Sequence, residues 1–584
     1  MHKNLFSSKN TLVILIIVFF CCTFLLCFIN VRSTFGPIHF DDELIYWKIA
    51  TRLFKGDFDI SKDNHYPPLY PLSLIPAFYF FGPNNTYKAA KVINAIFIAS
   101  AIFPSFLILR KFLEEKISLG IAIISILNPI SIVISRVVIS ENLYYPLFLW
   151  AVFFSFNSYQ ADNKKNPIFQ NIILGVILGL MLLTRYISLT IVPAFILIWW
   201  ITRIDFRMLD IKKILRNLPS FFYVLIPIIF IFSFWLIRGL SQNVPVKELL
   251  GLTLTDHPNP NQLSIKNLIM WVIFYVSFSI LIMSPYLSLF ILFITRFKKD
   301  QDDSEILLWL VSVLIIVLSI LIPSIMHSWR ANYNYPIPIR LQGRYLLYFG
   351  PLFMFTFYIF IGRYKPLVKA RISKWHYLII SMGMVFLSGA FLFLGFIFLD
   401  KPLSISISSP DGYLFGSSPI LFILVVIVLN FFTLILITKN KQLLFSVASF
   451  LLVFLFVFGN VNIFNKILFP KQIHNHEVII LIDKYKELSG NSGFSKEEIS
   501  LEIPNTTKAT IIKYWINALQ FNGYENIRYH LVGNNDLQEQ FILRMTIFPY
   551  EMSLVNCKDI ENDVYYYTSF SQSGFSYCII LTSL

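Results

Sequence analysis

The chain has 584 residues, of which 56% are hydrophobic and only 14% are charged, whereas charged residues make up roughly 25% of an ordinary soluble protein. This composition excludes a soluble globular protein. Inside a bilayer, backbone N–H and C=O groups can form hydrogen bonds only with one another, which favours helices. The composition therefore predicts an α-helical polytopic membrane protein. The net charge of +15 comes from short basic clusters between apolar runs, so we expect no nucleic acid among the partners.

Apolar runs long enough to cross a bilayer recur along most of the chain. They predict about thirteen transmembrane helices in a membrane domain of residues 1–460, with boundaries good to a few residues. The expected spans are 11–31, 88–109, 117–135, 139–156, 169–184, 186–201, 218–237, 267–295, 305–325, 344–361, 376–399, 418–438 and 442–460.

The basic clusters between these spans set the expected orientation in the cell membrane. Lysine and arginine gather on the cytoplasmic side of membrane proteins, and with this count the clusters all fall on one side. The N-terminus is then cytoplasmic, and a long first loop at 32–87 is extracytoplasmic. So are the loops at 238–266, 326–343 and 400–417 and the C-terminal tail.

The tail at 461–584 changes character, because charges and asparagines rise and apolar runs shorten. It predicts a small soluble extracytoplasmic α+β domain, with an amphipathic helix at 508–520 and strands at 527–532, 541–548 and 564–569. Cys557 and Cys578 could form a disulfide there if the domain is extracytoplasmic.

Three consecutive carboxylates, Asp41, Asp42 and Glu43, follow the first span and open an amphipathic stretch at 44–55. Ionisable groups at a membrane interface must stay hydrated, paired or reactive, so we interpret this acidic cluster as the mouth of an active site. The stretch after it predicts a helix at headgroup level, with Ile45, Ile49 and Leu53 on its apolar face. An ordinary interfacial helix with an acidic N-terminus is the alternative.

Two further segments belong to the same expected face. Paired prolines in the 64–72 stretch predict an extended segment that leads back to the membrane. Glu141 follows Ser140 at the outer end of a span, so it could converge with the acidic cluster, although a helix N-terminal charge explains it equally well. Gly175 and Gly179 have the spacing of helix packing in lipid.

Arginines also occupy the expected outer face, against the usual charge preference. Arg330, Arg340 and Arg344 flank one outer loop, and Arg136 and Arg185 lie at outer ends of spans. The planar guanidinium donates two parallel hydrogen bonds to a phosphate, which makes this group a candidate phosphate site. Contact with lipid headgroups is the alternative reading.

Taken in order, these segments resemble the GT-C superfamily of polytopic glycosyltransferases. Within it they are most similar to the group of the protein O-mannosyltransferases and the lipid A aminoarabinose transferase. The likeness covers roughly residues 10–360. It rests on Asp42-Glu43-x-x-Tyr46, Tyr66-Pro67-Pro68-Leu69-Tyr70-Pro71, Ser140-Glu141-Asn142-Leu143, Leu183-Thr184-Arg185 and Gly343-Arg344-Tyr345.

The resemblance implies an inverting transfer of a hexosyl or pentosyl group from a polyprenyl- or dolichyl-phosphate carrier to a hydroxyl on a protein, lipid or glycan. Asp42 would be the general base, with Asp41 as second choice and Glu43 beside them. The acceptor or sugar would be oriented by Glu141, Tyr46 and His65, and the donor phosphate bound by Arg344, Arg340, Arg330 and Arg185. No cofactor is required, although the acidic cluster could hold a divalent cation. Membrane lipids would surround the protein.

Two other functions stay open at this point. A transporter or flippase of lipid-linked or small polar substrates would place its ionisable residues near the bilayer midplane, whereas here they gather at the outer ends of spans. A ligase or polymerase of oligosaccharides is the alternative among enzymes.

Overall fold

The computed structural model describes most of the first 363 residues and five strands near the C-terminus. The described residues are 9–32, 40–59, 66–80, 86–127, 129–160, 167–201, 211–251, 265–266, 268–273, 275–277, 279–280, 301–331, 348–363, 383, 498–504, 526–532, 543–549, 564–570 and 575–581. Some side chains within these ranges, including those of Asp41 and Asp42, lie outside the description.

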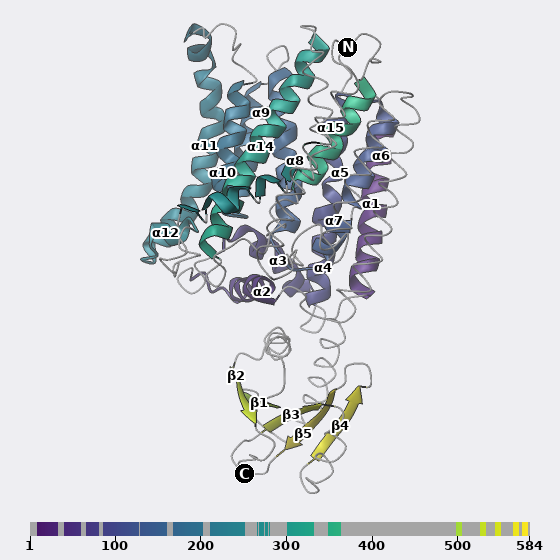
Figure 1. Cartoon of the computed structure of the whole chain (residues 1–584), viewed down its shortest axis with the longest axis vertical. Helices are drawn as coiled ribbons and strands as arrows, with labels where there is room; N and C mark the ends of the chain where they lie inside the picture. Colours follow the sequence, from purple (N-terminus) through teal and green to yellow (C-terminus); the bar gives the residue numbers. More distant parts are fainter. Residues whose placement is uncertain are drawn as a thin grey trace.

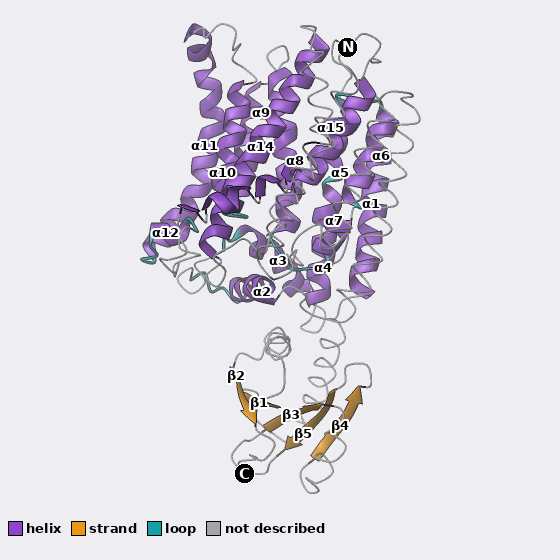
Figure 2. Cartoon of the chain, in the orientation of Figure 1, coloured by secondary structure: helices purple, strands orange, loops and turns teal. Residues whose placement is uncertain are grey.

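Helices make up the described part of the membrane domain (Figures 1 and 2). They are α1 Lys9–Arg32, α2 Phe40–Phe54, α3 Leu69–Phe80, α4 Thr86–Ser100, α5 Ile102–Arg110, α6 Glu115–Ile126, α7 Pro129–Ser135, α8 Glu141–Gln160, α9 Pro167–Leu182, α10 Ser188–Ile201, α11 Ile211–Ser241, α12 Val246–Leu249, α14 Gln301–Ala331 and α15 Phe349–Arg363.

Among the described residues, four helices are long and apolar enough to cross a membrane: Thr11–Asn30, Thr86–Arg110, Leu218–Ser241 and Glu305–Met326. Shorter apolar helices stand beside them, and the predicted helical membrane protein is confirmed. Apart from residue 383, the predicted spans at 376–399, 418–438 and 442–460 lie outside the described residues, so the expected number of spans stays a prediction.

Prolines mark irregular points in two predicted spans. The span at 88–109 consists of α4 and α5, which meet at Ala101 and run on as the one apolar helix Thr86–Arg110; Pro104 has no N–H to donate to the carbonyl one turn earlier. The span at 117–135 is divided into α6 and α7, and Pro129 is the first residue of α7. Proline suits that position, since the first N–H groups of a helix have no intrahelical partner.

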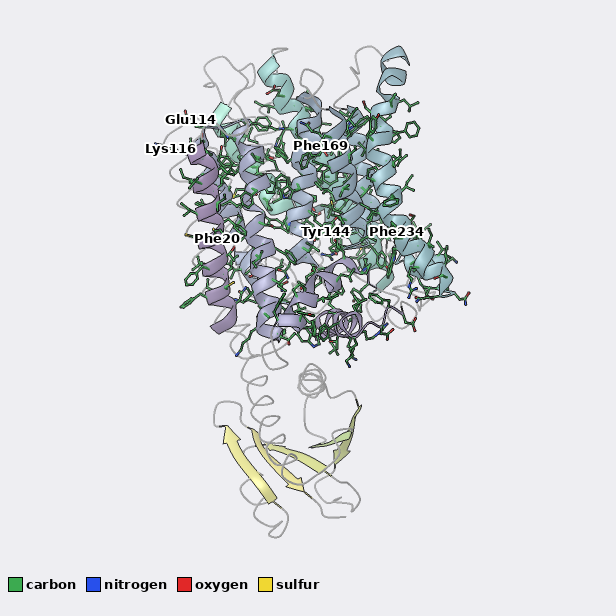
Figure 3. All side chains as sticks on the ribbon, turned by 180° about the vertical axis from the view of Figure 1, so that it is seen from behind. Phe20, Glu114, Lys116, Tyr144, Phe169 and Phe234 are labelled. Carbon is green, nitrogen blue, oxygen red and sulfur yellow. The ribbon has the colours of Figure 1, made fainter. Side chains whose placement is uncertain are left out.

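Large aromatic side chains are exposed on the outside of the bundle and buried in its interior. Phe20, Phe169 and Phe234 are each more than 60% exposed on the outside of α1, α9 and α11, whereas Tyr144 of α8 is fully buried (Figure 3). Exposed aromatic surface of this kind suits contact with lipid tails. Lys116 lies at the end of the bundle opposite the strands (Figure 3). With Arg110 and Lys111 it forms one of the basic clusters between spans that are predicted to be cytoplasmic.

Glycines let α9 approach α11 closely. A Cβ on Gly175 would lie 2.3 Å from the carbonyl oxygen of Val224, and one on Gly179 would lie 3.0 Å from the Cβ of Ile231. The predicted packing role of these two glycines is therefore confirmed.

Helix α2 lies across one end of the bundle and is seen end-on in Figure 1, whereas the bundle helices run along the vertical axis. Its buried side chains include Leu44, Trp47 and Ala50, while Ile45 and Leu53 are only half-buried. The helix is amphipathic as predicted, and Ile49 of the predicted apolar face is buried, but the other buried residues lie beside that face. The buried face is the one that carries the aromatic residues Tyr46 and Trp47, because tertiary packing turns this face toward the bundle.

The proline-rich segment is not extended throughout. Helix α3 begins at Leu69, directly after Pro67 and Pro68, and Pro71 lies in its first turn, where a missing N–H costs nothing. The expectation of an extended chain through residue 72 was therefore wrong. The N–H of Leu69 donates to the carbonyl of Leu183 at 2.9 Å, which joins this segment to the start of another sequence motif.

Five strands form one sheet in the C-terminal part: β1 Glu498–Pro504, β2 Asn526–Val532, β3 Leu543–Pro549, β4 Val564–Phe570 and β5 Phe575–Leu581. Their order is β2-β1-β3-β5-β4, with β1 parallel to β2 and β3, and the other pairs antiparallel. The three predicted strands are confirmed as β2, β3 and β4, whereas β1 and β5 were not predicted. The predicted helix at 508–520 and Cys557 lie outside the described residues.

The register of the antiparallel strands is defined by their Cα partners. Met545 of β3 pairs with Ile579 of β5, which also pairs with Tyr566 of β4, and Cys578 of β5 pairs with Thr546 and Tyr567. Figures 1 and 3 both show the sheet beyond the end of the bundle that carries α2.

Candidate functional site

The acidic cluster forms the first turn of α2, which begins at Phe40. Free N–H groups and the helix dipole favour carboxylates in that position, so Asp41, Asp42 and Glu43 suit the start of this helix. Glu43 is fully buried, whereas the side chains of the two aspartates lie outside the description. The predicted base is thus placed by its backbone alone.

Glu43 joins α2 to two other segments. Its Oε2 accepts a hydrogen bond from the hydroxyl of Tyr87 in α4 at 3.1 Å and another from the N–H of Val138 at 2.9 Å. Val138 belongs to the short connection between α7 and α8, which leads directly to Glu141. A buried carboxylate whose oxygen accepts two internal hydrogen bonds is suited to holding structure in place.

A chain of polar contacts leads from α2 through Glu141 to Tyr348, the residue directly before α15. The hydroxyl of Tyr46 donates to Ser140 Oγ at 2.7 Å, and Ser140 Oγ lies 3.5 Å from Glu141 Oε2. Glu141 Oε1 forms an ion pair with Arg185 Nη1 at 2.7 Å, and the same Nη1 donates to the hydroxyl of Tyr348 at 2.8 Å. The structure therefore brings Glu141 into the neighbourhood of the acidic helix.

Aromatic rings surround this chain of contacts. Tyr46 packs edge-on against Tyr66 and Tyr70 of the proline-rich segment, with ring centroids 4.8 and 5.1 Å apart. Tyr144 packs against Tyr348 with ring centroids 5.1 Å apart, and Arg185 Cζ lies 6.0 Å from the ring centroid of Tyr144. The proline-rich motif thus contributes aromatic walls to the site.

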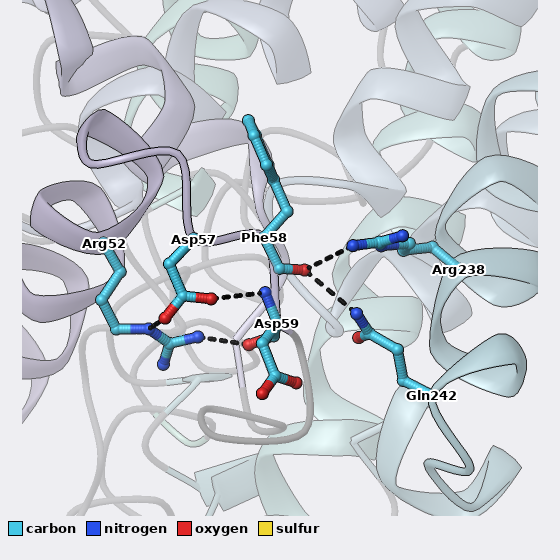
Figure 4. Close-up of polar contacts among 6 residues, drawn as sticks. All are labelled: Arg52, Asp57, Phe58, Asp59, Arg238 and Gln242. Carbon is cyan, nitrogen blue, oxygen red and sulfur yellow. Dashed lines mark hydrogen bonds and ion pairs between the residues drawn. The ribbon is translucent and has the colours of Figure 1, made fainter.

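The far end of α2 is held by a different set of contacts (Figure 4). Arg52 Nε pairs with Asp57 Oδ2 at 3.2 Å in the loop that follows the helix. The carbonyl of Phe58 in that loop accepts hydrogen bonds from Arg238 of α11 and from Gln242, which directly follows α11, both at 3.3 Å. Helix α2 is therefore attached at both ends, through Glu43 at the start and through this loop at the finish.

The predicted phosphate-binding residues are only partly described. Arg185 is 8% exposed, and its Nη1 is already engaged by Glu141 and Tyr348. Arg330 lies in α14 with its side chain outside the description, and His65, Arg340 and Arg344 lie outside the described residues. Among the described side chains, no group of three or more histidines, cysteines or carboxylates could hold a metal ion.

Arg136 is a buried cation near this site that could bind an anionic ligand. It lies in the connection between α7 and α8, is 6% exposed, and its Nε has no hydrogen-bond partner among the described residues. A buried guanidinium is costly unless an anion or hydrogen-bond acceptors meet it.

Tyr87, Lys91 and Tyr348 were not predicted as part of the site. A signal was present for the first two, because a lysine inside an apolar span one turn after a tyrosine is rare unless it has a function. Tyr348 carried no such signal, since its partner Arg185 lies 163 residues away in the sequence.

Comparison with known proteins supports the resemblance that the motifs indicate. Residues 61–241 match the family model of dolichyl-phosphate-mannose-protein mannosyltransferases. The match includes α3 with its proline-rich start, Glu141 and Arg185, and it begins after α2. The predicted likeness to this group is thereby confirmed for that part of the chain.

Two solved structures are among those that match the chain. ArnT from Cupriavidus metallidurans bound to undecaprenyl phosphate is 12% identical, covers 98% of each chain and has a TM-score of 0.49. The apo state of the same protein is 12% identical, covers 97% of each chain and has a TM-score of 0.48. A likeness at this level assigns no residue a role. No curated protein matches the sequence.

Proposed function

We propose that this protein is an inverting glycosyltransferase of the cell membrane. It moves a sugar from a polyprenyl- or dolichyl-phosphate carrier to a hydroxyl acceptor on the outer face. The match of residues 61–241 to the mannosyltransferase family supports the class of reaction. The observation that carries the proposal is the continuous set of contacts from α2 through Ser140 and Glu141 to Arg185. These contacts join residues of three separate motifs, which supports a single site.

In the proposed reaction Asp42 accepts the proton of the acceptor hydroxyl while that oxygen attacks the anomeric carbon. The bond between this carbon and the phosphate oxygen breaks, and the lipid phosphate leaves with the bonding electrons. Asp41 is the alternative base. Because attack and departure occur on opposite sides of the carbon, the sugar is transferred with inversion.

Cations would stabilise the charge that develops on the leaving phosphate. Arg344, Arg340 and Arg330 remain the proposed contacts. Arg185 can contribute only through groups other than the Nη1 that already binds Glu141 and Tyr348. The buried guanidinium of Arg136 supports adding this residue to the proposed phosphate contacts.

Glu141, Tyr46 and His65 are proposed to orient the acceptor or the sugar. The pairing of Glu141 with Arg185 favours an indirect contribution, in which the carboxylate fixes the guanidinium. The identity of the sugar and of the acceptor, and the need for a divalent cation, follow from none of these contacts.

The test compares Asp42→Asn with Asp41→Asn in membranes that contain the expressed protein. Polyprenyl-phosphate carriers with different radiolabelled sugars serve as probes, and transfer of label to membrane components is measured. Removing the base should lower transfer by about 10²–10⁴-fold. Near-normal transfer by Asp42→Asn together with loss in Asp41→Asn would move the base to Asp41, and near-normal transfer by both would refute a base in this cluster.

The phosphate contact is tested with Arg344→Ala and Arg344→Lys. We expect a rise of about tenfold or more in the KM for the lipid-linked donor in the alanine variant, with partial recovery in the lysine variant, because lysine keeps the charge but not the planar fork. Unchanged donor kinetics in both variants would exclude the phosphate role. Passage of intact lipid-linked sugar across vesicles without transfer would support the flippase alternative.

A further inference from the structure

We infer that Glu43, Tyr87 and Lys91 form a positioning unit that fixes the start of α2, and that Glu43 takes no direct part in the chemistry. The inference deepens the proposed function, because the residues next to Glu43 include the proposed base. It assigns Tyr87 and Lys91 of α4 a role for the site, and it changes the predicted role of Glu43.

The first support is the environment of the Glu43 carboxylate. Its side chain is fully buried, and its Oε2 accepts hydrogen bonds from the Tyr87 hydroxyl and the Val138 N–H at 3.1 and 2.9 Å. A general base or a sugar-binding carboxylate needs an oxygen within reach of the substrate. A buried oxygen held by two donors of the protein is suited to fixing its own helix instead.

The second support is the cation that accompanies this carboxylate. Lys91 is also fully buried, and its Nζ lies 4.2 Å from the ring centroid of Tyr87, one helical turn earlier in α4. Lys91 is attracted electrostatically by Glu43, whereas Arg136 and Lys88 carry the same charge as Lys91 and repel it. Opposite charges buried together stabilise each other, whereas either one alone would be costly in this apolar setting.

The third support is what the unit connects. Glu43 lies directly after Asp42 in the first turn of α2, and Val138 lies three residues before Glu141. The Glu43 carboxylate therefore joins its own helix, which carries the proposed base, to the segment that leads to the Glu141–Arg185 pair. Movement of either segment would change the spacing between the base and the rest of the site, and rate is sensitive to errors of about 1 Å.

The experiment uses Tyr87→Phe, Lys91→Met and Glu43→Gln in the full-length protein. Hydrogen exchange of the α2 amides, residues 40–54, is measured alongside transfer kinetics. Each variant should increase exchange at the start of α2 severalfold and lower kcat by about 3–30-fold, with the KM for the donor nearly unchanged. Lys91→Arg should recover part of the loss, because it keeps the charge.

Lys88→Met is the matched control, since Lys88 is an exposed lysine on the same helix. It should leave both exchange and kinetics as in the unaltered protein. If Glu43→Gln fails to fold, Tyr87→Phe still tests the inference, because it removes a single hydroxyl.

Unchanged exchange in α2 in both Tyr87→Phe and Lys91→Met would overturn the inference. A rise in the donor KM with unchanged kcat would also overturn it, because that result indicates substrate contact. If the unaltered protein transfers no sugar but the variants loosen α2, the proposed function fails while the positioning unit stands.

Discussion

The ion pair between Glu141 and Arg185 should be strongly coupled, and this can be measured by removing each partner alone and both together. The two side chains are 2% and 9% exposed, and their charged atoms lie 2.7 Å apart. Removing one partner of a buried pair costs about 3–5 kcal/mol, because the other charge stays buried without compensation. Glu141→Gln and Arg185→Met should each lose stability in this range.

The double variant should lose much less than the sum of the two single losses. No charge is then left uncompensated, so we expect a coupling energy of about 2–3 kcal/mol. The measurement is equilibrium unfolding of the purified protein by titration with a denaturing detergent. Tyr348→Phe is a further comparison, since it removes only the hydroxyl that accepts from Arg185 and should cost about 1 kcal/mol.

Additive effects would refute this reasoning. If the double variant loses the sum of the single losses within about 0.5 kcal/mol, the two residues do not act as a pair. The site would then lack the connection between α8 and the segment that carries Arg185, and the indirect role proposed for Glu141 would fail with it.

Two further predictions concern contacts around the site. Tyr46→Phe should cost about 1–2 kcal/mol in the same unfolding titration, because it removes the hydroxyl that donates to buried Ser140 at 2.7 Å; an unchanged midpoint would show that the bond contributes nothing. Gly175→Ala should lower the thermal stability, because its Cβ would lie 2.3 Å from the carbonyl oxygen of Val224, whereas Gly120→Ala has open space around it and should be neutral or stabilising. Equal melting temperatures for the two alanine variants would contradict the close packing of α9 on α11.

Helices and strands that are marked by a pattern within their own segment of sequence could be predicted well. The apolar runs place most described helices to within a few residues, and three of the five strands follow from alternation. The division of the 117–135 span before Pro129 was not predicted, because the apolar run continues through it.

The site could be predicted only in its parts. Glu43, Tyr46, Glu141 and Arg185 stand out as polar residues beside apolar spans, which identifies candidates without their partners. Their pairings join residues far apart in the chain, up to the 163 residues between Arg185 and Tyr348. Such contacts depend on how helices pack, and periodicity along one helix carries no information about it.

The amino-acid sequence by itself determined that this is a helical membrane protein with an acidic helix after its first span. Those properties follow from side-chain hydrophobicity and spacing within single segments. Only the tertiary structure decided that Glu43 is buried against α4 and that Arg185 is bound to Glu141. A buried charge takes whichever partner the packing of distant helices brings within reach, so its role is decided by the fold.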